Sequence, residues 1–253
     1  SAGASDSGAG EGGGSETGGT LTVAAAQGIP QLNPAIRTFA WEEVLFPLLW
    51  NGLTKTDESG AVVGALAEKW EASDDQKTWT FTLRAGVTFS DGTPFTAQVA
   101  KAALDYYVDP DTATQEKNKI SMISDVTATD DTTLTVTLSE PVATFPAALV
   151  WVKMIDASKV DSIDKEPIGT GPYTVSKFTP DDSVTLVPNE KYFGDKPALD
   201  EITIVKAAES TAAVTGLRSG DIDVLWSVPQ GDVAQLESGG DMVMVRPKSP
   251  SQW

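Results

Sequence analysis

The sequence predicts a mixed α/β to α+β fold, because strand patterns alternate with helix patterns and no internal repeat appears. Residues 78–84 alternate strictly between apolar and polar side chains, which is typical of a half-buried antiparallel strand. Residues 133–138 repeat this alternation. Thr96 is placed to N-cap a helix that continues through Tyr107 and stops at Asp109-Pro110. We therefore expect a sheet of antiparallel strands with a helix packed against it.

The other expected elements are shorter. An apolar run at 21–26 predicts a buried strand, and a helix of about three turns is expected over Phe39 to Leu49, before a turn at Asn51-Gly52. Beyond Gly169 the pattern predicts short strands separated by two helices, with glycines as stops. These strands are 173–175, 184–187, 202–205 and 222–225, the helices are 210–218 and 232–237, and the stops are Gly220 and Gly239.

The composition excludes several classes of function. The 253 residues include no histidine and no cysteine, which excludes a Ser-His-Asp triad, a thiolate nucleophile, a disulfide framework and a zinc-knuckle site. There are 18 Lys and Arg against 36 Asp and Glu, a net charge of −18, so nucleic acid and anionic membranes are poor partners. No run approaches the roughly 18 apolar residues of a spanning helix.

Local motifs that might hold a cofactor or metal have simpler interpretations. Gly169-Thr170-Gly171 lacks the rest of a phosphate loop and is interpreted as a tight turn that needs glycine dihedrals. Asp109, Asp111 and Glu116 lack the central glycine of a calcium loop and are interpreted as a solvated acidic turn. Three adjacent aspartate pairs are interpreted as turns before strands rather than as a glycosidase site; they are 74–75, 130–131 and 181–182. We expect no metal and no cofactor.

The first 19 residues are expected to be a disordered tether. Residues 1–20 hold eight of the 22 glycines and no large apolar side chain, so they cannot bury enough surface to offset the entropy of ordering. A frayed terminus or linker and the tether of a lipoprotein fit this composition equally well.

Two long stretches carry a resemblance to a known family. The segments 65–84 and 86–97, which include Gly86-Val87-Thr88-Phe89-Ser90-Asp91-Gly92-Thr93-Pro94-Phe95, resemble the signature region of the family 5 extracellular solute-binding proteins. The later segments 167–173, 189–197 and 219–223 resemble that family's other strong region, in the same order and spacing. These proteins are the peptide- and nickel-binding receptors of ABC importers, and the resemblance runs from about Gly19 to the end of the chain.

The resemblance implies a two-lobed receptor that closes on its ligand by a hinge, without chemistry, and delivers it to a membrane permease. Family members are about twice this length, so the chain is expected to be the first, periplasmic-binding-protein-like class II lobe. Residues 20–50 and 165–248 would form its main subdomain with a mixed sheet, 51–164 an inserted subdomain, and 249–253 the crossover toward a second lobe. We expect a monomeric, extracytoplasmic protein, lipid-anchored through a cysteine upstream of Ser1.

The resemblance also places the ligand cleft. Aromatic residues lie where a ring can line either a pocket or the core, and these are Phe39, Trp41, Trp50, Trp151 and Trp226. The expected cleft residues are Gly28, Ile29, Pro30, Arg37, Phe39, Trp41, Trp151, Lys153, Trp226 and Val228. Arg37 or Lys153 can pair with a ligand carboxylate, although each is also interpretable as a solvated or structural charge.

A peptide is the first expectation for the ligand, and an oligosaccharide, a nickel chelate or another small organic solute stays open. Two further classes compete with a transport receptor. One is a carboxylate-based hydrolase, which would turn over a substrate. The other is an interaction lipoprotein without a small ligand, whose cleft would be filled or collapsed.

Overall fold

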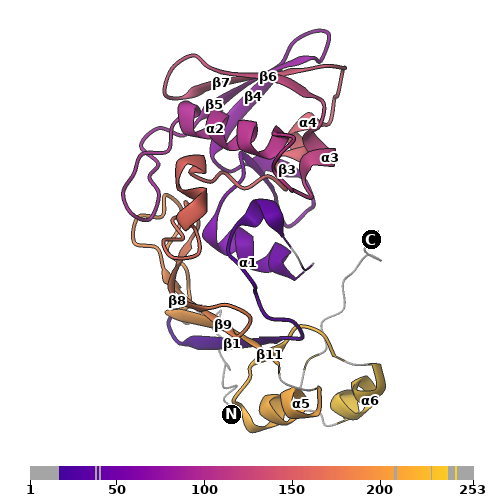
Figure 1. Ribbon diagram of the computed structural model, residues 1–253. Coiled ribbons are helices and arrows are strands. Elements are labelled where there is room, and N and C mark those ends of the chain that lie inside the picture. Colours follow the sequence, from indigo (N-terminus) through magenta and orange to yellow (C-terminus); the bar gives the residue numbers. More distant parts are fainter. Residues whose placement is uncertain are drawn as a thin grey trace, which may run out of the picture.

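The computed structural model describes residues 17–37, 39, 41–207, 210–228, 230–238 and 243. Figure 1 shows a four-stranded sheet at the top, a five-stranded sheet below it, and α1 (Glu42–Leu49) between the two. The expected tether and crossover lie outside the described residues, except for 17–19. Among the described residues, no helix is both long and apolar enough to cross a membrane.

The five-stranded sheet is mixed, as expected, in the order β11-β1-β10-β9-β8. Strand β1 runs parallel to both β10 and β11, whereas β9 is antiparallel to β10 and to β8. The strands are β1 (Thr20–Ala25), β8 (Tyr173–Thr179), β9 (Ser183–Pro188), β10 (Glu201–Lys206) and β11 (Val224–Leu225). The first strand therefore lies between two strands from the far end of the chain, so the amino-terminal loop after β1 meets the loop after β11.

The four-stranded sheet has the order β4-β5-β7-β6 and is antiparallel throughout. Its strands are β4 (Ala67–Ala72), β5 (Thr78–Leu83), β6 (Ile123–Ala128) and β7 (Thr133–Leu138). The alternation predicted for β5 is confirmed, because Trp79, Phe81 and Leu83 are buried while the intervening threonines are partly exposed. Helix α2 (Ala97–Val108) packs against β6 and β7, and the hydroxyl of Thr96 accepts the predicted capping hydrogen bond from the Val99 amide.

Smaller elements connect the sheets. They are η1 (Pro34–Ile36), β2 (Thr54–Thr56), β3 (Val62–Gly64), α3 (Lys117–Ile120), α4 (Phe145–Ala148), η2 (Ala157–Ser162), α5 (Ser210–Ser219) and α6 (Gln230–Ser238). In Figure 1, α5 and α6 lie beyond the five-stranded sheet, on the side away from α1. One continuous apolar core runs from the end of β1 through α1 to the four-stranded sheet.

Two expected elements need correction, and one expected helix stop is confirmed. The helix expected from Phe39 begins only at Glu42, whose carboxylate accepts a hydrogen bond from the Phe39 amide across the turn that precedes it. The strand expected at 222–225 shortens to β11, because Asp221 and Ile222 donate back to the Gly216 carbonyl at the end of α5. Gly220 has a φ of 84°, which confirms it as the helix stop, whereas Gly239 lies outside the described residues.

The Gly169-Thr170-Gly171 segment is tight for a different reason than predicted. Neither glycine has a positive φ. A Cβ on Gly169 would overlap the carbonyl oxygen of Leu49, and one on Gly171 would lie 2.5 Å from the carbonyl oxygen of Leu48. Close approach to the end of α1, rather than glycine dihedrals, therefore excludes side chains at both positions.

Candidate functional site

Two pockets include residues of the segment that leads into α1. The first, here called the Lys153 pocket, has a volume of about 150 Å³ and is lined by Pro34, Arg37, Glu43, Phe46, Pro47, Glu116, Val150, Trp151 and Lys153. The second, here called the Trp226 pocket, has a volume of about 320 Å³ and is lined by Ala26, Gln27, Phe39, Trp41, Trp226 and Ser227. Arg37 lines one pocket and Phe39, two residues later, lines the other.

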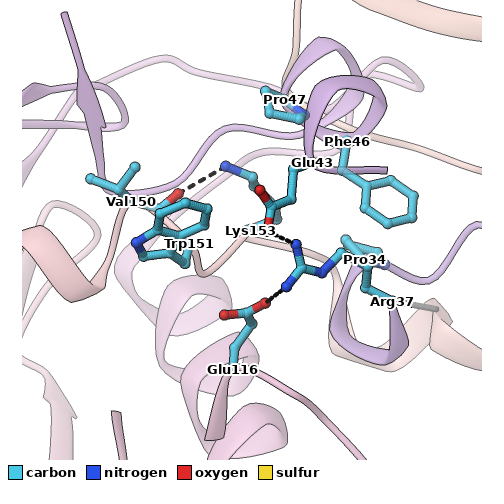
Figure 2. Close-up of a pocket in the computed structure, with 9 residues that line it drawn as sticks. All are labelled: Pro34, Arg37, Glu43, Phe46, Pro47, Glu116, Val150, Trp151 and Lys153. Atoms are coloured by element: carbon cyan, nitrogen blue, oxygen red, sulfur yellow. Dashed lines mark hydrogen bonds and ion pairs between the residues drawn. The ribbon is translucent and has the colours of Figure 1, made fainter. Parts of the chain in front are cut away.

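Arg37 is held in place by two carboxylates (Figure 2). Its guanidinium forms an ion pair with Glu43 on α1, and its Nη2 lies 3.1 Å from Oε1 of Glu116. Only 12% of the Arg37 side chain and 4% of the Glu116 side chain are exposed. The other oxygen of Glu116 accepts a hydrogen bond of 2.5 Å from Lys119. Arg37 therefore already has partners for its charge.

Lys153 has a different environment in the same pocket. Its Nζ donates a hydrogen bond of 2.8 Å to the carbonyl oxygen of Val150, which Figure 2 shows at the pocket wall. Among the described residues, no carboxylate oxygen lies within the 4.0 Å of an ion pair with this Nζ. Burial lowers the pKa of Lys153 to about 8, although the charges of Glu116 and Glu43 act in the opposite direction. Nearby Arg37 lowers this pKa further.

Trp151 forms the rim of the Lys153 pocket. Its side chain is 43% exposed, and the Nζ of Lys119 lies 5.0 Å from the centroid of its ring, which is a cation–π distance. The Lys119 ammonium thus contacts both Trp151 and Glu116. The rim is aromatic on one side and charged on the other.

The Trp226 pocket lies where two parallel strands end. Ala26 and Gln27 directly follow β1, and Trp226 and Ser227 directly follow β11. The Trp226 amide donates to the carbonyl of Ala24 at 2.9 Å, which fixes the start of this loop beside β1. Ligands of open α/β sheets bind beyond the carboxyl ends of the parallel strands, so this edge is where a ligand is expected. The Trp226 side chain is 48% exposed, whereas that of Trp41 is buried.

The structure brings six of the ten expected cleft residues into these pockets. They are Arg37, Trp151 and Lys153 in the Lys153 pocket and Phe39, Trp41 and Trp226 in the Trp226 pocket. Pro30 and Val228 are partly buried and line neither pocket. Trp50, the remaining aromatic residue considered, is fully buried and donates from its indole to the carbonyl of Ile168 at 2.8 Å.

Gly28 and Ile29 pack against the turn between β8 and β9 instead. The Ile29 carbonyl accepts a hydrogen bond of 2.7 Å from the amide of Asp181. A Cβ on Gly28 would overlap the backbone of the same aspartate. This loop therefore fixes the course of the chain toward Arg37.

Sequence reasoning missed Glu43 as a pocket residue, and it considered Glu116 only for calcium. In the structure Glu116 forms ion pairs with Arg37 and Lys119. The carboxylate of Asp109 accepts a hydrogen bond from the amide of Asp111 in a local turn. In the part of the chain that the structure describes, no group of three or more acidic side chains is placed to hold a metal ion. The signal that could have indicated Glu116 as an ion-pair residue was the two nearby cations, since Lys117 follows it directly and Lys119 comes three positions later.

Comparison with solved structures identifies the same architecture in periplasmic binding proteins. The chain superimposes on AgaA from A. tumefaciens R10, determined with agropinic acid, with a TM-score of 0.80 and 28% identity over 87% of this chain and 46% of that one. The Escherichia coli murein tripeptide binding protein MppA gives a TM-score of 0.79 and 26% identity over 87% of this chain and 48% of that one. These likenesses confirm the expected class of lobe.

Similar sequences belong to transport-associated binding proteins. The nickel-binding periplasmic protein of Escherichia coli K12 is 33% identical over 218 residues, which are 81% of this chain and 41% of that protein. The glutathione-binding protein GsiB of Shigella boydii is 29% identical over 238 residues, 91% of this chain and 46% of that protein. The chain thus spans less than half the length of these relatives. Residues 61–253 match the family described as bacterial extracellular solute-binding proteins, family 5 Middle, and the chain belongs to this family.

Proposed function

We propose that this chain forms the first lobe of an extracytoplasmic receptor that captures a small solute, a peptide in the first instance, and delivers it to the permease of an ABC importer. Family membership supports this role, as do relatives named for binding nickel, glutathione or a murein tripeptide. In this proposal residues 20–50 and 165–248 are the main subdomain, and 51–164 are an insertion. The lobe works as a monomer that a cysteine upstream of Ser1 anchors to lipid.

The observation that carries the proposal is the position of the two exposed tryptophans. Among the described tryptophans, only Trp151 and Trp226 are exposed, at 43% and 48%, and each lines one of the two pockets. Exposed indoles that rim concave sites are typical of ligand recognition, because they supply large contact areas at a low entropic cost. A tryptophan that served only the core would be buried, as Trp50 is.

The chemistry of the pockets favours a peptide over the alternatives. The Lys153 ammonium has only a carbonyl partner and therefore suits a ligand carboxylate. A nickel chelate fits this pocket only if its chelator supplies that carboxylate. The aromatic walls of the Trp226 pocket suit apolar side chains of varied shape. An oligosaccharide would stack on the same rings but would leave the ammonium without an anionic partner.

The pocket also supports binding without chemistry. Glu43 and Glu116 are its two carboxylates, and both pair with Arg37. A carboxylate-based hydrolase needs one protonated and one ionised carboxyl group facing the same bond, and paired carboxylates held by a guanidinium do not provide the acid.

Native mass spectrometry of the full-length protein, purified gently from its own host, tests this function. We expect adducts in the mass range of short peptides, which disappear after partial unfolding and refolding. An equimolar pool of tripeptides added to the refolded protein should restore them. A protein that carries no adduct from the host and none from the pool would contradict the peptide receptor. Hydrolysis of the pool would instead support the hydrolase.

A further inference from the structure

We propose that Lys153 recognises a carboxylate of the bound peptide, and that Arg37 is a positioning residue that keeps Glu43 and Glu116 away from Lys153. This inference rests on the proposed receptor function and names the ligand group that the Lys153 pocket takes. The carboxylate can come from the carboxyl terminus of the peptide or from an acidic side chain, and the test below separates these sources.

The charges around the pocket do not cancel. Three cationic side chains, Arg37, Lys119 and Lys153, accompany two carboxylates, Glu43 and Glu116. Both carboxylates contact Arg37, and Glu116 also contacts Lys119. One positive charge is left over at Lys153, in a chain whose net charge is −18. An uncompensated cation in such an acidic protein is therefore a local feature of this pocket.

Lys153 is also short of hydrogen-bond partners. An ammonium group carries three donors, and the structure gives this one a single acceptor, the carbonyl of Val150. A largely buried charge that lacks a counter-charge destabilises the folded state, and the pKa of about 8 reflects that cost. A ligand carboxylate would supply both the counter-charge and the missing acceptors.

Arg37 is unsuited to bind the ligand itself, because both terminal nitrogens of its guanidinium pair with carboxylates and its unpaired Nε is buried. Its position explains why Lys153 stays available. Glu116 and Glu43 are near enough to raise the pKa of Lys153 by their charge, yet the guanidinium holds both of them. Without Arg37 these carboxylates would be free to pair with Lys153 and to repel an incoming anion.

The size of the pocket limits what enters it. A volume of about 150 Å³ accepts a carboxylate and a few neighbouring atoms but not a whole tripeptide. The remainder of the ligand would extend past Phe39 toward the larger, aromatic Trp226 pocket. The two pockets together thus suit a short peptide that places an anionic group at one end and an apolar side chain at the other.

The test compares binding of two pools by the full-length protein, followed by native mass spectrometry. One pool is an equimolar mixture of tripeptides with free carboxyl termini, and the other holds the same sequences as carboxyl-terminal amides. We expect the acids to bind at least tenfold more tightly than the amides. Binding of amides that contain Asp or Glu, and of no other amides, would assign the carboxylate to a side chain. Either result supports the recognition of an anionic group.

The variants Lys153→Gln and Lys153→Arg assign the recognition to this residue. Lys153→Gln should remove the preference for anionic peptides, and Lys153→Arg should retain most of it. Lys119→Gln is the matched control, because Lys119 is a cation at the rim of the same pocket and already has a carboxylate partner. An unchanged preference in Lys153→Gln, or equal binding of acids and amides by the wild type, would overturn the proposal and leave the receptor function intact. Absence of binding from both pools would overturn both.

Arg37→Gln tests the positioning role through the titration of Lys153, which can be followed by NMR of its side chain. We expect the pKa of Lys153 to rise above its value of about 8, because two carboxylates are released and a neighbouring positive charge is lost. Arg37→Lys should restore part of the wild-type behaviour. A folded Arg37→Gln variant with an unchanged pKa at Lys153 would show that Arg37 has only a structural role.

Discussion

The Nη2 of Arg37 lies 3.1 Å from Oε1 of Glu116, and this ion pair joins the segment before α1 to the residue that immediately precedes α3. Both side chains are largely buried. The pair therefore connects parts of the chain that are 79 positions apart, between the ranges proposed as the main and inserted subdomains.

Removal of the Glu116 charge should destabilise the protein. Glu116→Gln leaves the buried guanidinium of Arg37 with one carboxylate instead of two, and loss of one partner from a buried ion pair costs about 3 kcal/mol. Urea unfolding at pH 7 measures this difference. Glu68→Gln is the control, because Glu68 is 53% exposed and lies 3.9 Å from Arg84, and it should change the free energy of unfolding by no more than about 0.5 kcal/mol. Equal effects of the two substitutions would contradict the importance of burial here.

The titration of Lys153 should appear in the pH dependence of stability. The pKa of Lys153 is about 8 in the folded protein, whereas an unperturbed lysine, as in the unfolded chain, has a pKa of 10.5. Between these two pH values the unfolded chain therefore binds more protons than the folded one. Stability contributed by this group therefore rises as the pH increases from about 8 to 10.5. The wild type should gain stability relative to Lys153→Met over this window, measured by urea unfolding at pH 7, 8, 9 and 10. A constant difference across the series would contradict the shifted pKa.

Gly169 should tolerate no side chain. A Cβ there would overlap the carbonyl oxygen of Leu49, which belongs to the backbone and cannot rotate away. Gly169→Ala should therefore cost more than about 3 kcal/mol or prevent folding. Gly231→Ala is the matched control, because no atom lies within 4 Å of its added Cβ and alanine favours the helix. A stable Gly169→Ala protein with the same melting temperature would show that this close approach is not required.

The sequence predicts some elements closely because their burial pattern is local. Residues 133–138 are a strand with the predicted bounds, since each alternate side chain enters the core. β4 was missed because it is an edge strand whose residues are mostly charged and exposed, so its pairing with β5 leaves no alternation in the sequence. β6, the other edge strand, was also missed, because a register shift in its pairing with β7 interrupts the alternation.

The pocket residues show the same limit of sequence-based prediction, which is that contacts between distant segments leave no local pattern. The family resemblance indicated Trp151, Trp226 and Lys153 as cleft residues. The sequence could not distinguish Arg37 from Lys153 as the partner of a ligand carboxylate. Only the fold brings Glu116 to Arg37 across 79 positions of the chain, where it joins Glu43, which is six positions away. Likewise, the family resemblance placed Gly28 in the cleft, in the loop after the first strand, whereas it packs against the backbone of Asp181 from a distant turn.

The ion pair of Asp91 and Lys159 should stabilise the protein only above strongly acidic pH. Burial raises the pKa of Asp91, but hydrogen bonds from Lys159 and Thr93 outweigh it and lower this pKa to about 2. The stabilisation is present above the ordinary pKa of 3.8 and is lost as the pH falls through about 2. Asp91→Asn should thus lower the free energy of unfolding by about 1 kcal/mol at pH 7 and have little effect near pH 2. An equal loss at both values would indicate a packing effect.

Trp226 should contribute to ligand binding rather than to stability. Its side chain is 48% exposed at the mouth of the Trp226 pocket, so Trp226→Ala removes contact area from a ligand while the core stays intact. We expect at least a tenfold loss of affinity for the tripeptide pool and a change of no more than about 0.5 kcal/mol in the free energy of unfolding. Val44→Ala is the control, because Val44 is similarly exposed, at 47%, but lines neither pocket. If both variants bound the peptides as the wild type does, the ligand would not contact this tryptophan, and the aromatic pocket would need another occupant.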